Sequence, residues 1–349
     1  MAPAQARAEA PAQPLIVAEA GSAERPQDSA SAFQIAIDQG CDFLQANLVA
    51  TRDGAFAVRR DNELSATTDV ATRPEFAARR TTKAIDDVLL TGWFAEDFTL
   101  AELKTLKCRE AWPRLRPQSA RFDGQDRVLS LEEVLAIARA GCVKTARTIG
   151  VFPRILHGRY YAGLGLEVED RLARLLTVAG YQARAAAVWV QAFEAASLEA
   201  FGRGSPLRRM QVIAAAQDEA QGPLSPLTTP AGLAAARAYA DAICVDPSLV
   251  IDPDAAVFPA PTTLVLDARA AGLQLFAGTV RAENQFLPGA LRRGDPASAS
   301  FPARQGDAGK LLVALFAGGV DGVATDQPGM AARARSAAIR ALERRRTGF

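Results

Sequence analysis

The stretch CDFLQANLVATRDGAFAVRRDNEL, residues 41–64, has the composition of two short strands around an Asp-Gly turn at 53–54, and this dipeptide favours tight reversals. Because side chains alternate along a strand, Gln45 and Asn47 share one face of the first strand. Arg60 lies near the end of the second strand. Barrel proteins carry out their chemistry with polar groups at the ends of neighbouring strands. We therefore place the centre of the predicted site here.

Outward from this stretch, apolar strand-like runs alternate with helical patterns. Repeated strand-then-helix units predict a parallel sheet with helices outside it. About eight such units favour a closed (β/α)8 TIM barrel over an open doubly wound sheet, because no G-x-G-x-x-G run follows a strand. Besides residues 41–64, strands are expected at 15–18, 148–152, 188–193, 210–214, 242–245, 273–280 and 322–325, and helices at 29–39, 129–140, 166–179, near 198, up to 239, at 263–271, 310–317 and from 328.

Two segments depart from this alternation. Residues 67–117 contain turns and a short helix after a Thr99 cap, which indicates an insertion after the second strand region that covers one end of the barrel. Residues 1–13 are rich in Ala, Pro and Gln without periodicity, and we expect a disordered leader. This leader lacks the apolar core of a signal peptide. Residues 14–349 are expected to form a single domain.

Composition excludes several functions. Lys and Arg number 40 against 39 Asp and Glu, so no bulk field attracts nucleic acid or an anionic membrane. No apolar run approaches the roughly 20 residues that span a bilayer. A single histidine, His157, excludes any mechanism with two imidazoles. The cysteines form no C-x-x-C pair, and we interpret them as small buried residues rather than disulfide partners; they are Cys41, Cys108, Cys142 and Cys244.

Several runs, in order along nearly the whole chain after residue 13, resemble the glycerophosphodiester phosphodiesterase family in its longer bacterial branch, whose members are often exported. The resemblance implies a TIM barrel, phosphoric diester hydrolysis in lipid metabolism, and a periplasmic or secreted location. Besides residues 41–64, the runs are Thr91-Gly92-Trp93-Phe94, Glu96-Asp97-Phe98-Thr99-Leu100, Gln191 within VWVQAF, Arg281-Ala282-Glu283-Asn284-Gln285-Phe286-Leu287-Pro288 and Gly319-Val320-Asp321-Gly322-Val323-Ala324-Thr325-Asp326.

The catalytic positions implied by this resemblance are substituted. The family has a His-Arg-Gly after the first strand, where this chain has Glu19-Ala20-Gly21. Arg60 occupies the position of the second catalytic histidine. His157 lies just beyond the ligand motif, and we expect a partly exposed loop residue. Glu19 could serve as a base, although an ion pair with Arg60 or Arg154 is the interpretation we favour.

The metal-binding positions are substituted as well. The family's Glu-x-Asp pair, which holds calcium or magnesium, is Gln45-Ala46-Asn47 here. The last metal ligand and a phosphate-contacting lysine lie in a Pro-Glu-x-Lys run, which reads Pro153-Arg154-Ile155-Leu156. Hard divalent cations need anionic oxygen ligands, and a metal is the family's Lewis acid. We therefore expect no metal cofactor.

Together these substitutions make the site about two charges more positive than the family pattern, which is about what a divalent ion contributes. We therefore hypothesise a catalytically inactive relative that binds a glycerophosphodiester or another phosphate-containing small molecule. The expected ligand-binding residues are Arg60, Arg154, Gln45, Asn47 and Gln191. The alternatives are an active hydrolase with a remodelled site, and a structural or partner-binding barrel.

Overall fold

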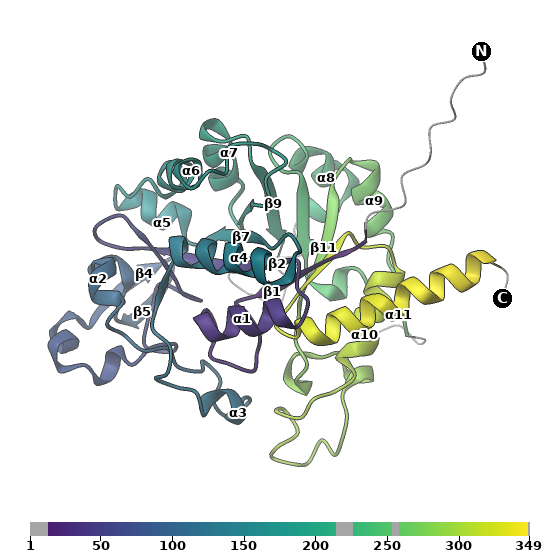
Figure 1. Ribbon diagram of the computed structural model, residues 1–349, viewed down its shortest axis with the longest axis horizontal. Helices are drawn as coiled ribbons and strands as arrows, with labels where there is room; N and C mark the ends of the chain where they lie inside the picture. Colours follow the sequence, from purple (N-terminus) through teal and green to yellow (C-terminus); the bar gives the residue numbers. More distant parts are fainter. Residues whose placement is uncertain (1–12, 214–225, 253–257, 348–349) are drawn as a thin grey trace.

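The computed structural model describes residues 13–213, 226–252 and 258–347, and within these ranges eight parallel strands close into a barrel (Figure 1). Their hydrogen-bonded order is β1-β12-β11-β10-β9-β8-β7-β2, and β2 pairs with β1 to complete the ring. The predicted (β/α)8 TIM barrel is confirmed. The barrel strands are β1 (Leu15–Glu19), β2 (Phe43–Ala50), β7 (Gly150–Ile155), β8 (Trp189–Ala192), β9 (Arg208–Ile213), β10 (Ala242–Val245), β11 (Gln274–Val280) and β12 (Gly322–Thr325).

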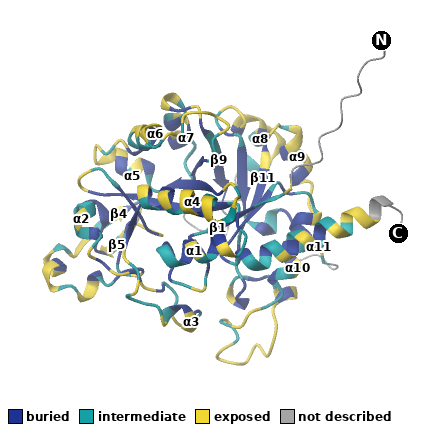
Figure 2. Ribbon diagram, in the orientation of Figure 1, coloured by how far each residue is buried: buried dark blue, intermediate teal, exposed yellow. Residues whose placement is uncertain are grey.

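Helices surround this barrel and bury their apolar faces against it, whereas their outer faces are exposed (Figure 2). Amphipathic spacing accounts for this arrangement, because residues three and four apart share one face of a helix. The longer helices are α1 (Ala30–Asp38), α4 (Leu131–Thr145), α6 (Val168–Val178), α7 (Ala195–Gly204), α10 (Ala308–Ala317) and α11 (Pro328–Thr347), and shorter ones are α3 (Pro117–Ala120), α5 (Gly158–Gly163), α8 (Pro230–Ala236) and α9 (Leu264–Ala270).

Aromatic side chains fill the interior of the barrel. Phe152 is central: its ring centroid lies 4.5 Å from that of Phe43, 5.6 Å from Trp189 and 5.9 Å from Phe276. Burying each of these rings stabilises the fold by roughly 1.5–3 kcal/mol. Because the interior is packed with side chains, polar chemistry is confined to the carboxyl ends of the strands.

The sheet continues beyond the barrel on one side. β3 (Phe56–Val58) pairs antiparallel with β2 around the predicted Asp-Gly turn, and β6 (Leu129–Ser130) pairs with β3. The predicted helix at 129–140 was therefore wrong at its start. Leu129 and Ser130 belong to a strand, and the Ser130 side chain then caps α4, which begins at Leu131.

The insertion forms a satellite core beside the barrel. Thr99 caps the short helix α2 (Leu100–Leu103) as predicted, with a complete capping box. Sequence analysis missed the hairpin of β4 (Thr81–Ile85) and β5 (Val88–Gly92), because its turn is Asp-Asp instead of the usual Asn-Gly or Asp-Gly. Two short 3-10 helices precede it, η1 (Val70–Thr72) and η2 (Pro74–Arg79). Figure 1 shows this hairpin and α2 on the opposite side of the molecule from α9.

Most other boundaries shift by a few residues, and β7 extends to Ile155 rather than ending at 152. Helix α5 was not predicted, and α7 is longer than the short helix expected near residue 198.

The four cysteines are free thiols. The predicted leader falls almost wholly outside the described residues. Over the described ranges, no helix combines the length and the apolar character needed to cross a membrane.

Candidate functional site at the barrel mouth

Strand register brings the predicted polar residues into one layer. Glu19 on β1 is paired with Gln45 on β2, Asn47 on β2 with Arg154 on β7, and Arg154 with Gln191 on β8. Parallel partners point their side chains to the same face. Glu19, Arg154 and Gln191 lie at or next to the carboxyl ends of their strands, and Gln45 and Asn47 lie level with them on β2, which continues beyond the barrel. The five residues therefore line the mouth of the barrel.

Hydrogen bonds fix this layer. Gln45 Nε2 donates to Asn47 Oδ1 at 2.9 Å. Arg154 is 7% exposed, and its Nε donates to Gln191 Oε1 at 3.0 Å. Arg154 Nη1 lies 3.5 Å from Glu19 Oε1, which is one of the two ion pairs, with Arg60 or with Arg154, that the sequence favoured. The two amides thus bond to each other, and the guanidinium is held by the third amide and a carboxylate.

A second arginine, Arg60, lies at the same mouth without a carboxylate partner among the described residues. Its guanidinium lies over the Trp112 ring, 4.3 Å from the centroid. Burial and the nearby Arg281 lower the pKa of Arg60, and Glu19 only partly opposes this. Arg281 Nη2 lies 3.8 Å from Glu19 Oε1, so Glu19 is shared between Arg154 and Arg281. Arg281 Nε also lies 3.7 Å from Asp326 Oδ2. Arg60 is therefore the guanidinium group of this set that has no ion pair among the described residues.

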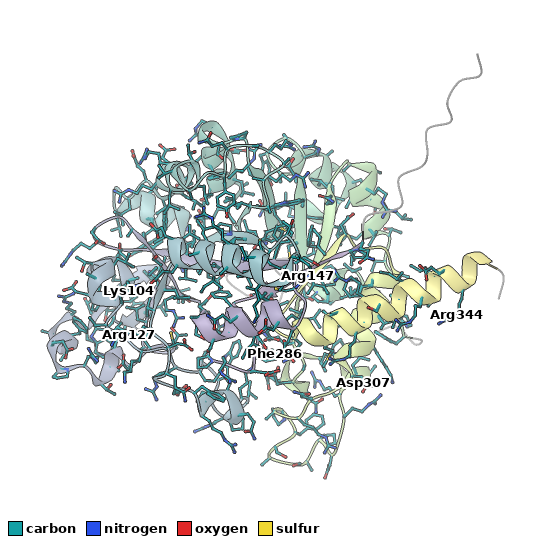
Figure 3. The ribbon with its side chains drawn as sticks, viewed as in Figure 1. Lys104, Arg127, Arg147, Phe286, Asp307 and Arg344 are labelled. Atoms are coloured by element: carbon teal, nitrogen blue, oxygen red, sulfur yellow. The ribbon has the colours of Figure 1, made fainter. Side chains whose placement is uncertain are left out.

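Arg281 belongs to a run that resembles the family, but sequence analysis did not assign it to the site, although it follows β11 directly and barrel proteins place their polar groups at strand ends. Its guanidinium lies 5.1 Å from the ring centroid of Phe286, labelled in Figure 3, and 5.4 Å from that of Trp112. These rings are themselves neighbours, 5.4 Å apart. Trp112 comes from the insertion, so the insertion contributes a wall of the site.

The insertion also supplies a buried arginine, Arg116. Its Nε donates to Glu283 Oε1 at 2.7 Å, and its Nη2 donates to Asp326 Oδ2 at 2.5 Å. All three side chains are at most 6% exposed. Burial raises the pKa of the Asp326 carboxyl, against the attraction of Arg116 and Arg281. This network joins residues 116, 283 and 326 across the mouth.

Asp28 is the least expected polar residue of this region. It is fully buried in a left-handed backbone conformation, with φ of 57°. Neither of its carboxyl oxygens has a hydrogen-bond partner. Burial raises the pKa of Asp28 to about 6, and Glu19 adds to this, while Arg59 and Arg60 oppose it. A carboxyl group that titrates near neutral pH is therefore placed close to Glu19 and the arginines.

A cavity of about 1090 Å³ opens beside Arg60. Its wall includes Asp61, the tip of the β4–β5 hairpin, His157 and Phe193. His157 is 18% exposed, and its Nδ1 and Nε2 lie 2.5 Å from Asp86 Oδ2 and 3.1 Å from Asp61 Oδ1. Burial alone would lower the pKa of His157, but hydrogen bonds to Asp61 and Asp86 outweigh it and raise the pKa to about 9. The sequence placed this histidine in a loop but gave no sign of its partners.

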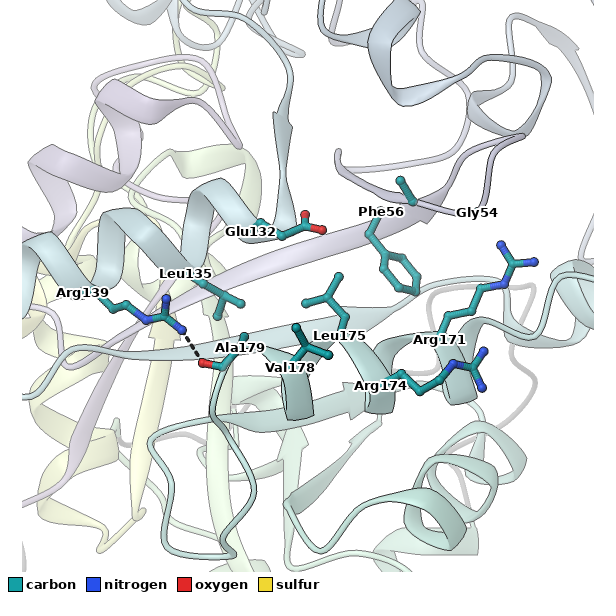
Figure 4. A pocket seen from close by; sticks show the side chains of 11 residues that line it. Gly54, Phe56, Glu132, Leu135, Arg139, Arg171, Arg174, Leu175, Val178 and Ala179 are labelled. Carbon is teal, nitrogen blue, oxygen red and sulfur yellow. Dashed lines mark hydrogen bonds between the residues drawn. The ribbon is translucent and has the colours of Figure 1, made fainter.

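A different cavity, of about 570 Å³, lies outside the barrel between α4 and α6 (Figure 4). Leu135, Leu175 and Val178 give it an apolar floor, and arginines such as Arg139 stand at its edge. Arg139 Nη2 donates to the carbonyl of Ala179 at its edge. None of the predicted site residues lines it. Of the predicted site residues, Arg60 lines the larger cavity, and the others lie in the layer at the barrel mouth beside it.

The fold places this protein among the (β/α)8 TIM barrels, and its mouth carries arginines, amides and carboxylates. The family model described as "Glycerophosphoryl diester phosphodiesterase family" matches residues 20–330. This chain therefore belongs to the glycerophosphoryl diester phosphodiesterase family. It is 28% identical to the glycerophosphodiester phosphodiesterase GDPD6 of Arabidopsis thaliana over 291 residues, which cover 79% of this chain and 76% of the relative.

Shorter matches and solved structures agree with this assignment. A glycerophosphodiester phosphodiesterase of Treponema pallidum is 26% identical over 189 residues, 52% of this chain and 51% of that protein. The fold is similar to that of an Oleispira antarctica phosphodiesterase solved in complex with the product sn-glycerol-3-phosphate, with a TM-score of 0.59, 17% identity, and coverage of 93% of this chain and 97% of that one. The fold is also similar to that of a glycerophosphodiester phosphodiesterase from Agrobacterium tumefaciens, with a TM-score of 0.57 and 16% identity. This match covers 92% of this chain and 99% of that one. These structures support the shared fold.

Proposed function

We propose that this protein binds a phosphate-containing small molecule, such as a glycerophosphodiester, at the mouth of its barrel without a divalent metal, and does not hydrolyse it. The observation that carries the proposal is the buried guanidinium of Arg154. It stands where the resemblance to the family motif expects a carboxylate metal ligand, and it is held by Gln191 and Glu19. An arginine fixed in this way offers charged hydrogen-bond donors where the relatives would offer a cation.

The residues at the mouth do not fit a divalent metal. Calcium and magnesium take carboxylate, carbonyl and water oxygens. Here Asn47 Oδ1 already accepts a hydrogen bond from Gln45, and Arg154 brings positive charge to the strand position beside Asn47. In the part of the chain that is described, no group of three or more His, Cys, Asp or Glu side chains is arranged to hold a metal. Metal-assisted hydrolysis therefore has no part in the proposed function.

The arginines at the mouth favour an anion. Arg154 and Arg281 share the carboxylate of Glu19 at 3.5 and 3.8 Å, and Arg281 also lies 3.7 Å from Asp326. Among the described residues, Arg60 has no carboxylate within ion-pair distance. Arg281 Nε is buried without a hydrogen-bond partner. Arginine binds phosphate oxygens with a planar array of donors, and such charged hydrogen bonds are stronger than neutral ones. A phosphate group would supply both the charge and the acceptors.

Calorimetric titration in the presence of a chelator tests this proposal. Glycerol 3-phosphate should bind wild-type protein at millimolar concentration or below. Arg154→Ala should weaken binding about tenfold or more, because a hydrogen bond to a charged group contributes roughly 1.5–3 kcal/mol. Arg208→Ala is the matched control, since Arg208 lies over Trp189 at the opposite, amino-terminal end of the strands. It should leave the affinity unchanged.

Absence of binding by wild-type protein, or equal affinity of wild type and Arg154→Ala, would overturn the proposal.

A turnover assay tests whether the protein hydrolyses a glycerophosphodiester. Glycerophosphocholine incubated with the protein should not be hydrolysed above background, with or without added calcium or magnesium. Metal-dependent release of glycerol 3-phosphate would restore the family's enzymatic function.

A metal-independent hydrolase is the second candidate, and Asp28 is the observation that favours it. A carboxyl group with a pKa of about 6 is suited to proton transfer near neutral pH. In this case glycerophosphocholine would be hydrolysed in the presence of the chelator, and Asp28→Asn would abolish turnover without abolishing phosphate binding. Equal turnover of Asp28→Asn and wild type would exclude this role for Asp28.

A further inference from the structure

The β4–β5 hairpin depends on contacts at its tip. It forms a two-stranded sheet by itself, and such a sheet is marginally stable in water unless it packs on something else. Its strands are mostly exposed, and Val88 and Leu89 are 46% and 73% exposed. Along the strands, Lys83 forms ion pairs with Glu96 and Asp97. At the far end Ile85 is 3% exposed, and the side chains of the turn add polar contacts to this apolar one.

The two turn residues, Asp86 and Asp87, contact neighbouring segments through their side chains. Asp86 and Asp87 both have positive φ, 46° and 68°, where Asn-Gly is the favoured pair. The two aspartates instead place carboxylates against the loop that follows β7. Asp86 Oδ2 accepts a hydrogen bond from His157 Nδ1 at 2.5 Å, and Asp87 Oδ2 accepts one from Arg159 Nη2 at 2.9 Å. The side chains of the turn thus connect the hairpin to the segment that follows β7.

His157 joins three segments of the chain. Its second nitrogen, Nε2, lies 3.1 Å from Asp61 Oδ1, next in sequence to Arg60. The imidazole therefore links the hairpin tip, the loop after β7 and the loop after β3. Its own backbone is left-handed, with φ of 53°, which aims the ring between the two carboxylates. Asp61, Asp86 and His157 all line the cavity of about 1090 Å³ that also includes Arg60.

We infer that His157 is a positioning residue that clamps the tip of the β4–β5 hairpin and Asp61 together, and that this clamp sets the outer wall of the cavity where the part of the ligand beyond its phosphate lies. The clamp itself stands on the contacts of His157. Its effect on ligand choice rests on the proposed function. Residues 81–92 thereby become a selectivity element, although they lie outside the barrel strands.

The charges around the imidazole make the clamp dependent on pH. Asp61 and Asp86 face it from the loop after β3 and from the hairpin, and the Tyr161 ring on α5 lies 6.5 Å away. Arg60, Arg159, Glu169 and Glu194 line the same cavity. The pKa of His157 is raised from 6.5 to about 9. The clamp is therefore complete below about pH 6.5 and is lost as the pH rises through about 9.

Hydrogen exchange at pH 7 without ligand tests the clamp directly. In His157→Ala and in Asp86→Asn, the amides of residues 81–92 should exchange about tenfold faster than in wild type. Asparagine tolerates positive φ, so the second variant removes the charge and keeps the turn. Arg159→Ala is the matched control. Its pair with Asp87 is 71% and 90% exposed and should contribute little. Unchanged exchange in both clamp variants would overturn the proposal.

The single histidine makes the titration unambiguous by imidazole NMR. Wild-type protein should titrate with a midpoint near pH 9, and Asp86→Asn should titrate at least about one unit lower. A wild-type midpoint near 6.5 that Asp86→Asn does not change would contradict the clamp. Neither measurement involves a ligand, so failure of the proposed phosphate binding does not affect them.

The selectivity role has its own readout. His157→Ala should change the ratio of the dissociation constants for glycerophosphocholine and inorganic phosphate by about fivefold or more. A purely structural defect would weaken both alike. Equal changes for the two ligands, together with faster exchange of the hairpin, would overturn the selectivity role and leave the phosphate site intact.

Discussion

Single substitutions decide the chemistry of the barrel mouth, and Glu19 is the one on which the charge balance depends. It is the only carboxylate that the described residues place within 4 Å of Arg154, and it is shared with Arg281. Its second oxygen, Oε2, is buried without a hydrogen-bond partner. Glu19 thus competes with any anion for the arginines.

Glu19→Gln should therefore tighten the binding of glycerol 3-phosphate by about fivefold or more, because two unit charges about 4 Å apart interact by about 1 kcal/mol even when they are screened as in bulk water. Calorimetry in chelator measures the change. Glu132→Gln serves as the control, because Glu132 lines the groove between α4 and α6 outside the barrel. Weaker binding by Glu19→Gln would mean that Glu19 accepts a hydrogen bond from the ligand instead of competing with it.

Sequence alone was sufficient to place Gln45, Asn47, Arg154 and Gln191 at the mouth. Strand periodicity and register determine where such side chains point. It was insufficient for Arg116, whose partners lie 167 and 210 residues away. Contacts of this kind depend on how the insertion returns to the barrel, and no local pattern encodes that path.

At the scale of elements, the start of α4 shows how a local signal competes with sheet pairing. Leu129 and Ser130 have a helical pattern downstream, yet they pair with β3. Ser130 then forms a capping box: its Oγ accepts from Glu133 N at 3.3 Å, and Glu133 Oε2 accepts from Ser130 N at 2.8 Å. The strand ends at Ser130, which caps the helix that begins at Leu131.

Ser130→Ala should lower the free energy of unfolding by about 1 kcal/mol, because it removes an acceptor from the first turn of α4. Urea denaturation followed by circular dichroism measures this change. Ser336→Ala on the exposed face of α11 is a control that should change the stability by less than about 0.5 kcal/mol. Equal effects of the two variants would show that the cap does not stabilise the helix.

At the scale of the whole molecule, the buried network of Arg116, Glu283 and Asp326 ties the insertion to the loops that follow β11 and β12. Arg116→Met should destabilise the protein by about 3–5 kcal/mol, because it leaves buried Glu283 without its partner and leaves Asp326 with Arg281 alone, 3.7 Å away. The loss should shrink as the pH falls towards the pKa of the Asp326 carboxyl, which burial raises, because protonation removes its charge.

The matched control for this prediction is Arg293→Ala, which breaks an exposed pair with Asp307. It should change the free energy of unfolding by no more than about 1 kcal/mol. If Arg116→Met is as stable as this control, the insertion does not depend on the network for its position.

The barrel as a whole could be predicted from the sequence because alternation of strands and helices is a pattern repeated along the chain. The hairpin of the insertion could not, because its turn is Asp-Asp instead of the usual Asn-Gly or Asp-Gly, and Asp86 contacts His157, which lies 71 residues away. Asp86 and Asp87, which replace the usual residues of such a turn, both line the cavity beside Arg60.

The most direct test of metal-independent phosphate binding is a crystal structure of the protein soaked with glycerol 3-phosphate in the presence of a chelator. The account predicts a phosphate group within hydrogen-bond distance of the guanidinium groups of Arg154 and Arg60, with the bond between Gln45 and Asn47 intact. A phosphate elsewhere on the surface, or a divalent cation bound between Gln45 and Asn47 when the chelator is replaced by calcium or magnesium, would contradict it.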